Sequence, residues 1–174
     1  MPHSVEFEQW VPFPIEPVFR FFANPENLPR IMPRQTQTRI DELHLVPPLG
    51  LDERTNVNRL AGRGTEIVTS FRILPLWPLR AQWIARITEF EWNHYFADIQ
   101  VKGPFQTWHH RHELATEVRD GIHGTVVRDR IEYAVGPGLL GEVAARLFVA
   151  RQLRRTFLSR QKTLPTLLAG APSS

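Results

Sequence analysis

Residues 94–133 constrain the fold of this chain more than any other stretch. They indicate three long strands joined by two tight turns, because runs rich in β-branched and aromatic residues are separated by short turn signals. Gly103-Pro104 marks the first turn and Asp120-Gly121 marks the second. Strands joined by such short turns pair antiparallel with each other. The stretch therefore predicts an antiparallel sheet.

The faces of these three strands mix polar and apolar side chains. Because side chains alternate along a strand, three sets should each share one face: Phe96, Asp98 and Gln100; Trp108, His110, His112 and Leu114; and Thr125, Val127, Asp129, Ile131 and Tyr133. An ordinary sheet would turn the polar members of these sets toward water. Two interpretations stay open: the polar groups line a cavity, or they face solvent.

The segments before this stretch supply more strands and two short helices. Glu16-Pro17 opens one helix, since proline is tolerated in a first helical turn, and residues 26–31 can form the second. Residues 47–64 are a loop that could cover the mouth of a cavity. Alternating or apolar patterns predict the remaining strands at residues 4–11, 36–46, 65–73 and 79–90.

A long helix is predicted at the end of the chain. From about Leu139 to Leu164, apolar residues recur at steps of three and four, as on one face of an amphipathic helix. Pro165 should end this helix, which leaves residues 165–174 as a flexible tail. A single domain over residues 1–164 follows. The helix arginines should lie mainly on its solvated faces, and they include Arg151, Arg154, Arg155 and Arg160.

These elements predict an α+β fold. A curved antiparallel sheet of about six to seven strands would wrap around the long C-terminal helix, with two short helices after strand 1. One helix of about seven turns cannot fill the concave side of such a sheet. A cavity between helix and sheet is therefore expected.

Composition and missing motifs exclude several classes of protein. The chain has no cysteine, so it forms no disulfide and uses no thiolate. No stretch approaches the ~20 apolar residues that span a bilayer, and we expect a cytoplasmic protein of bacterial type without an integral membrane segment. The net charge of +3 is too small to indicate a nucleic-acid partner, and none is expected. The chain also has no glycine-rich phosphate loop and no G-x-S-x-G motif.

Residues 96–112 carry the motif F-x-D-x-Q-x-x-G-P-F-x-x-W-x-H-x-H. This motif and the order of elements resemble the SRPBCC superfamily, whose members share the helix-grip fold of START lipid-binding domains, the birch pollen allergen and polyketide aromatase/cyclases. The resemblance covers roughly residues 5–157. It implies a pocket, because some members bind lipids, steroids or phenolic compounds and others cyclise polyketides.

The resemblance implies that the chain binds a small hydrophobic or amphipathic ligand, such as a lipid, an aromatic or a polyketide-like molecule, in an internal cavity. The aromatic candidates could equally belong to the core, and the polar ones to a buried hydrogen-bond network. The candidate ligand-binding residues are Trp83, Phe96, Asp98, Gln100, Trp108, His110, His112, Asp129 and Tyr133.

The alternative function is a cofactor-free polyketide aromatase/cyclase or dehydratase. His110 or His112 would be its general acid/base, poised near neutrality by Asp98 or Asp129. Tyr133 would be a proton donor. The catalytic candidates in that case are His110, His112, Asp129 and Tyr133, and no cofactor is expected.

Two further interpretations concern metals and partners. His110 and His112 with Asp98 or Asp129 imitate a metal site of two imidazoles and a carboxylate, but the resembled family is not generally metal-dependent, so we expect no metal. The helix arginines could attract an anionic partner or a membrane surface, although a solvated face explains them more simply. The expected partner is a small hydrophobic ligand, and a homodimer stays an open alternative.

Overall fold

The structure is a computed structural model that describes residues 2–51, 57–72, 80–136 and 148–170. Its helices are α1 (Ile15–Ala23), α2 (Leu28–Ile31) and α4 (Ala150–Ala169), with short 3-10 turns η1 (Pro25–Asn27), η2 (Arg34–Thr36) and η3 (Val57–Arg59). Its strands are β1 (His3–Val11), β2 (Arg39–His44), β3 (Glu66–Arg72), β4 (Arg80–Glu91), β5 (Tyr95–Lys102), β6 (Thr107–Arg119) and β7 (Ile122–Ala134).

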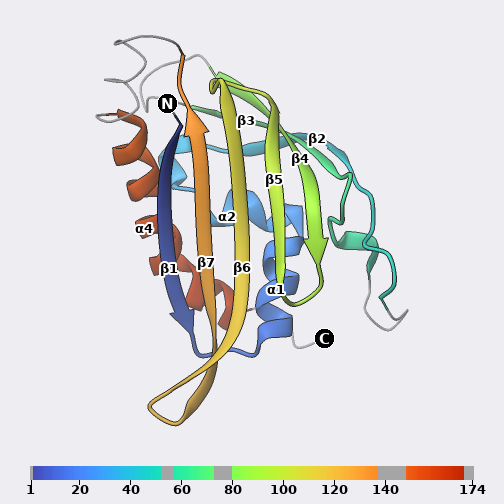
Figure 1. Ribbon diagram of the computed structural model, residues 1–174, viewed down its shortest axis with the longest axis vertical. Helices are drawn as coiled ribbons and strands as arrows, with labels where there is room; N and C mark the ends of the chain where they lie inside the picture. The colour runs from blue at the N-terminus through green and yellow to red at the C-terminus, as the bar shows by residue number, and fades with distance from the viewer. Residues whose placement is uncertain (1, 52–56, 73–79, 137–147, 171–174) are drawn as a thin grey trace.

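Within the described residues, the seven strands form one antiparallel sheet in the order β1-β7-β6-β5-β4-β3-β2. Every neighbour in this order is also the next strand in the chain, except that β1 pairs with β7. Helices α1, α2 and α4 all lie behind the sheet in the view of Figure 1, so they cover a single face. The α+β arrangement expected from the sequence, with a long C-terminal helix and short helices after the first strand, is confirmed.

The central hairpins form as the turn signals predict. Asp120 and Gly121 connect β6 to β7 and both have positive φ, 51° and 76°, which is the backbone that a two-residue hairpin turn requires. The hairpin of β6 and β7 extends beyond the rest of the sheet at the bottom of Figure 1. Its register places His112 opposite Asp129, and the next pair of strands places Asp98 opposite His110. The polar residues of three adjacent strands thus share one region of the sheet.

Two groups of buried apolar side chains hold the helices against this face. The larger group joins α1 to β1, β5 and β7 and includes Phe19, which is fully buried. The smaller group contains Ile131, Tyr133 and Phe157, and the ring of Phe157 on α4 stacks on Phe7 of β1 at 4.1 Å between centroids. Burial of these large side chains stabilises the contact of α4 with the edge of the sheet.

The end of the last helix differs from the expectation. α4 runs through Pro165 to Ala169, so the prediction that Pro165 ends the helix and begins a flexible tail is wrong for residues 165–169. Leu164 and Leu168 lie one helical turn apart and are both buried, and their packing keeps the helix intact across the proline. The predicted start at Leu139 and residues 171–174 lie outside the described residues. None of the described helices has the length and apolar character needed to cross a membrane.

Candidate functional site

A pocket of about 500 Å³ lies between the sheet and the helices. Most of the side chains around it are apolar, and they come from α1, α2, α4 and strands β3 to β7. The alternation of β3 and β4 is as predicted, since Ile67, Thr69 and Phe71 of β3 and Trp83, Ala85 and Ile87 of β4 line the pocket. From the loop at residues 47–64, Ala61 lines the pocket, and residues 52–56 lie outside the described residues.

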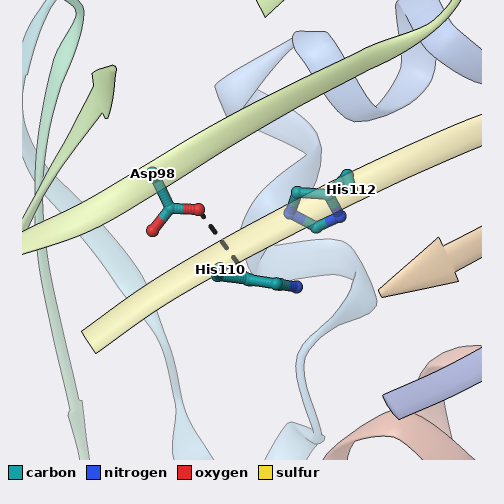
Figure 2. A group of neighbouring side chains, drawn as sticks. All are labelled: Asp98, His110 and His112. Atoms are coloured by element: carbon teal, nitrogen blue, oxygen red, sulfur yellow. Dashed lines mark ion pairs between the residues drawn. The ribbon is translucent and has the colours of Figure 1, made fainter. Parts of the chain in front are cut away.

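The polar part of the pocket is built by His110 and His112 of β6 with Asp98 of β5. The two imidazole rings lie side by side with centroids 3.9 Å apart, and Nδ1 of His110 lies 3.8 Å from Oδ2 of Asp98 (Figure 2). All three side chains are mostly buried, with exposed fractions of 10% to 17%. In the structure, Asp98, His110 and His112 thus line the pocket and are largely shielded from solvent.

Asp129 of β7 contacts both histidines. Its Oδ1 lies 3.1 Å from Nε2 of His110, within hydrogen-bond distance. The same oxygen lies 2.6 Å from Nδ1 of His112, and this ion-pair contact does not have the geometry of a hydrogen bond. Asp129 is 1% exposed and is not among the residues that line the pocket. Its expected contact with the ligand stays a prediction, and in the structure Asp129 contacts the two histidines of β6.

Arg160 of α4 completes the group, and the sequence analysis placed it incorrectly. Its Nη1 donates a hydrogen bond of 3.0 Å to Oδ1 of Asp129, and its Nη2 donates another to Oδ2. The guanidinium also packs on the rings of Phe22 and Phe157, with 5.2 and 4.4 Å to the centroids. Arg160 is 5% exposed and lines the pocket, whereas Arg151, Arg154 and Arg155 are exposed as expected.

The burial of Arg160 has a signal in the sequence. It lies three residues after Phe157 and four before Leu164, so it falls on the same helical stripe as the buried apolar residues. A charged residue on such a stripe needs a buried partner of opposite charge. Asp129, on a strand face that is otherwise apolar around it, is that partner.

Burial and neighbouring charges set the protonation of this group. Burial alone would raise the pKa of Asp129, but Arg160 and the two histidines together hold the pKa of its carboxyl well below the ordinary value. Burial raises the pKa of Asp98, with the neighbouring histidines opposing the shift. Burial lowers the pKa of His110, and the nearby His112 acts in the same direction. Asp129 is therefore ionised while His110 favours its neutral form, which donates to Asp129 through Nε2.

The predicted aromatic residues line the pocket, with one exception. Trp83, Phe96 and Trp108 are part of its wall, and the rings of Trp83 and Trp108 meet edge to face at 4.8 Å. Tyr133 is not part of the wall, because it packs in the core with Ile131 and is 1% exposed. Burial raises the pKa of its phenol. Tyr133 is therefore a core residue of this structure, and its expected roles as ligand contact and proton donor stay predictions.

Gln100 supports a turn and does not line the pocket, which corrects its predicted role in ligand binding. Its amide donates a hydrogen bond of 2.7 Å to the Phe105 carbonyl and accepts one from the Phe105 N–H. A Cβ at Gly103 would lie only 2.3 Å from Oε1 of Gln100, so a side chain there would displace this amide. The motif residues Gln100 and Gly103 thus shape the hairpin between β5 and β6.

Solved structures share this fold at low sequence identity. TTHA0849 from Thermus thermophilus is 16% identical, with a TM-score of 0.63 over 98% of this chain and 100% of that chain. Ara h 8.0201 is 13% identical, with a TM-score of 0.62 over 98% of this chain and 100% of that chain. Norcoclaurine synthase from Thalictrum flavum, solved in complex with dopamine and hydroxybenzaldehyde, is 14% identical, with a TM-score of 0.61 over 99% and 90% of the two chains. These likenesses confirm the helix-grip fold.

The sequence itself also matches a known family. A comparison with curated proteins found no match. A family model described as "Polyketide cyclase / dehydrase and lipid transport" matches residues 11–162, which include every strand from β2 to β7 and the polar site residues Asp98, His110, His112, Asp129 and Arg160. The resemblance to the SRPBCC superfamily is thereby confirmed, and the chain belongs to the polyketide cyclase / dehydrase and lipid transport family.

Proposed function

We propose that the protein binds a small hydrophobic or amphipathic molecule in the pocket between α4 and the sheet. The observation that carries this proposal is the pocket itself: about 500 Å³, walled mainly by apolar and aromatic side chains, with polar groups gathered at Asp98, His110, His112 and Arg160. Pockets of this size and composition suit drug-sized organic molecules, whose few polar atoms are oriented by such groups. Family membership supports the same function.

The pocket walls indicate which chemical groups of a ligand would suit each part of the pocket. Trp83 and Trp108 present flat apolar surfaces at right angles, which suit a ring system or a bent chain. The polar groups carry one fixed charge pair, Arg160 with Asp129. Beyond it lie two imidazoles and the Asp98 carboxyl, which can donate hydrogen bonds to a ligand or accept them from it. A mainly apolar ligand with an oxygen function at one end fits this distribution.

Binding is tested by native mass spectrometry of freshly purified protein and by fluorescence titration with an apolar naphthalene dye. The variant A85W places a bulky ring into the pocket wall and should abolish dye binding. The matched control is A115W, because Ala115 is exposed on strand β6 and does not line the pocket. Equal dye binding by the A85W and A115W proteins, both folded by circular dichroism, would exclude this pocket as the binding site.

The second candidate function is a cofactor-free aldol cyclisation with dehydration, and one observation favours it. His110 faces the pocket with one nitrogen on ionised Asp129 and the other toward Asp98. A neutral imidazole so held can remove a proton from a carbon between two carbonyls. The resulting carbanion attacks a second carbonyl carbon, the new alkoxide takes up a proton, and loss of water follows.

Turnover separates the two candidates. With a poly-β-ketone thioester as the substrate, the H110A protein should lose cyclisation measured by product chromatography while it still binds the naphthalene dye. Cyclisation by the wild-type protein no faster than in buffer would leave binding as the function.

A further inference from the structure

Three side chains with metal-ligating atoms face one another in the wall of the pocket. Asp98, His110 and His112 each offer one such atom, and the three atoms all lie within 4.8 Å of one another. Both histidines come from β6 and the carboxylate comes from the adjacent β5, as Figure 2 shows. Because regular strands of one sheet hold all three residues, their relative positions are fixed by backbone pairing.

Asp129 orients the imidazole of His110 for binding a cation and also contacts the ring of His112. Its Oδ1 contacts Nε2 of His110 and Nδ1 of His112, so each ring directs one nitrogen at the same carboxylate. The second nitrogen of His110 is Nδ1, which lies 3.8 Å from Oδ2 of Asp98. A carboxylate on the far nitrogen fixes the tautomer and raises the basicity of the nitrogen that faces a metal, as in carboxylate–histidine–zinc sites.

The charges of the group leave a place for a cation beside Asp98. Arg160 pairs with Asp129 through both terminal nitrogens, so Asp129 is already balanced. Within the described part of the chain, the ion-pair contact of Asp98 is with His110, whose Nδ1 lies 3.8 Å from Oδ2, and no arginine or lysine pairs with it. A buried carboxylate without a permanent positive partner is costly, and a divalent ion at this position would supply the missing charge.

We propose that Asp98, His110 and His112 bind a divalent transition-metal ion, for which Zn²⁺ is the best suited, with its remaining coordination positions open to the pocket. Two imidazoles and a carboxylate are borderline donors that suit Zn²⁺ or Fe²⁺ more than Mg²⁺ or Ca²⁺. Binding would draw the three atoms together, since metal–ligand distances of about 2.0–2.2 Å require ligands about 3.4 Å apart.

This inference reverses the expectation of no metal, because the sequence did not show that Asp129 contacts both rings or that Arg160 pairs with Asp129. It does not rest on the proposed binding function. A bound ion would occupy both imidazoles, so it excludes the metal-free acid/base role of His110 in the same molecule. An organic ligand can still fill the apolar part of the pocket.

The experiment uses the untagged full chain, treated with EDTA and desalted, then dialysed against Zn²⁺ and analysed for metal content. One Zn²⁺ per chain is expected, and Co²⁺ should give visible absorption bands of a four- or five-coordinate site. The variants H110A, H112A and D98N should each lose stoichiometric binding. The D129N protein should bind about 10- to 100-fold more weakly, because it loses only the support behind the imidazoles.

The control is H109A, because His109 lies on the same strand as His110 and His112 with its side chain on the opposite face, 37% exposed. It should bind Zn²⁺ as the wild-type protein does. Since a pocket variant can fail to fold, the imidazole NMR signals of the wild-type protein give a second measurement. Co²⁺ should strongly shift the signals of two histidine rings. The spectra of H110Q and H112Q, each of which lacks one of these signals, assign them to His110 and His112. Two outcomes would overturn the proposal: a content below about 0.2 Zn²⁺ per chain, or unchanged Zn²⁺ binding by H110A and H112A.

Discussion

Arg160 of the last helix donates hydrogen bonds through both terminal nitrogens to the carboxylate of Asp129 on strand β7. Both side chains are almost fully buried, so neither charge is compensated by water. The pair joins α4 to the sheet at the point where the two pocket histidines also meet Asp129. One ion pair therefore connects the stability of the fold with the geometry of the site.

Removal of one member of this pair should be strongly destabilising. The variant R160M keeps much of the side-chain volume but leaves the Asp129 charge buried without its main partner, which should cost about 3–5 kcal/mol of unfolding free energy in urea titrations. The control R155M changes an exposed arginine of the same helix and should stay within about 0.5 kcal/mol of wild type.

The double variant R160M/D129L tests whether this loss comes from the unpaired charge. With both charges replaced by apolar groups, most of the stability should return. If R160M unfolds at the same urea concentration as R155M, the pair contributes nothing to stability.

Tyr133 should ionise only at unusually high pH. Burial raises the pKa of its phenol, and absorbance at 295 nm should show one tyrosine step above the ordinary value that disappears in Y133F. Because the folded-state pKa is raised, the stabilisation by the neutral phenol is present below the unfolded pKa and is lost as the pH rises through the folded pKa. Alkaline unfolding of wild type should therefore be steeper than that of Y133F, and identical alkaline unfolding curves would contradict the burial of this residue.

Gly124 should tolerate no side chain. A Cβ there would lie 2.5 Å from the Val11 carbonyl oxygen and 2.5 Å from the Trp10 ring, and the backbone oxygen cannot rotate away. G124A should lower the unfolding free energy by about 1–3 kcal/mol in thermal or urea unfolding. G136A is the matched control, because a Cβ at Gly136 meets nothing within 4 Å. Equal stability of the two variants would show that β1 and β7 are farther apart than described.

Tryptophan fluorescence should report the occupied pocket. Trp83 and Trp108 line it, whereas Trp10 and Trp92 do not. A naphthalene dye in the pocket should quench emission by energy transfer, and most of this quenching should vanish in the W83F/W108F double variant. The double variant W10F/W92F should keep it, and quenching carried by Trp10 or Trp92 would place the dye elsewhere.

The local patterns predicted most of the fold and part of the site. Alternation with a period of two brought His110 and His112 to one face with Asp98 opposite, because antiparallel pairing across short turns leaves little freedom of register. The same pattern could not show which residues of a face line the pocket and which are covered by other side chains. Asp129 and Tyr133 share their strand face with the pocket residues, yet other side chains cover both.

The misplaced residues depend on contacts between distant parts of the chain. An arginine-rich helix predicts a solvated position for Arg160, and its contact with Asp129 of β7, far away in the sequence, explains why it is buried. Gln100 was assigned to the pocket by alternation, but its amide closes the adjacent turn. α4 continues past Pro165 because Leu168 packs in the core, which overrides the local tendency of proline to end a helix.

The pairing of β1 with β7 has a consequence for synthesis of the chain on the ribosome. Strand β1 is made long before its partner β7, which follows the other described strands, since His3 pairs with Tyr133. Asp129 in turn leaves the ribosome before Arg160. Until α4 has emerged, the apolar side chains that it covers and the carboxylate of Asp129 lack their partners, so this interval is when aggregation through the uncovered face is most favoured.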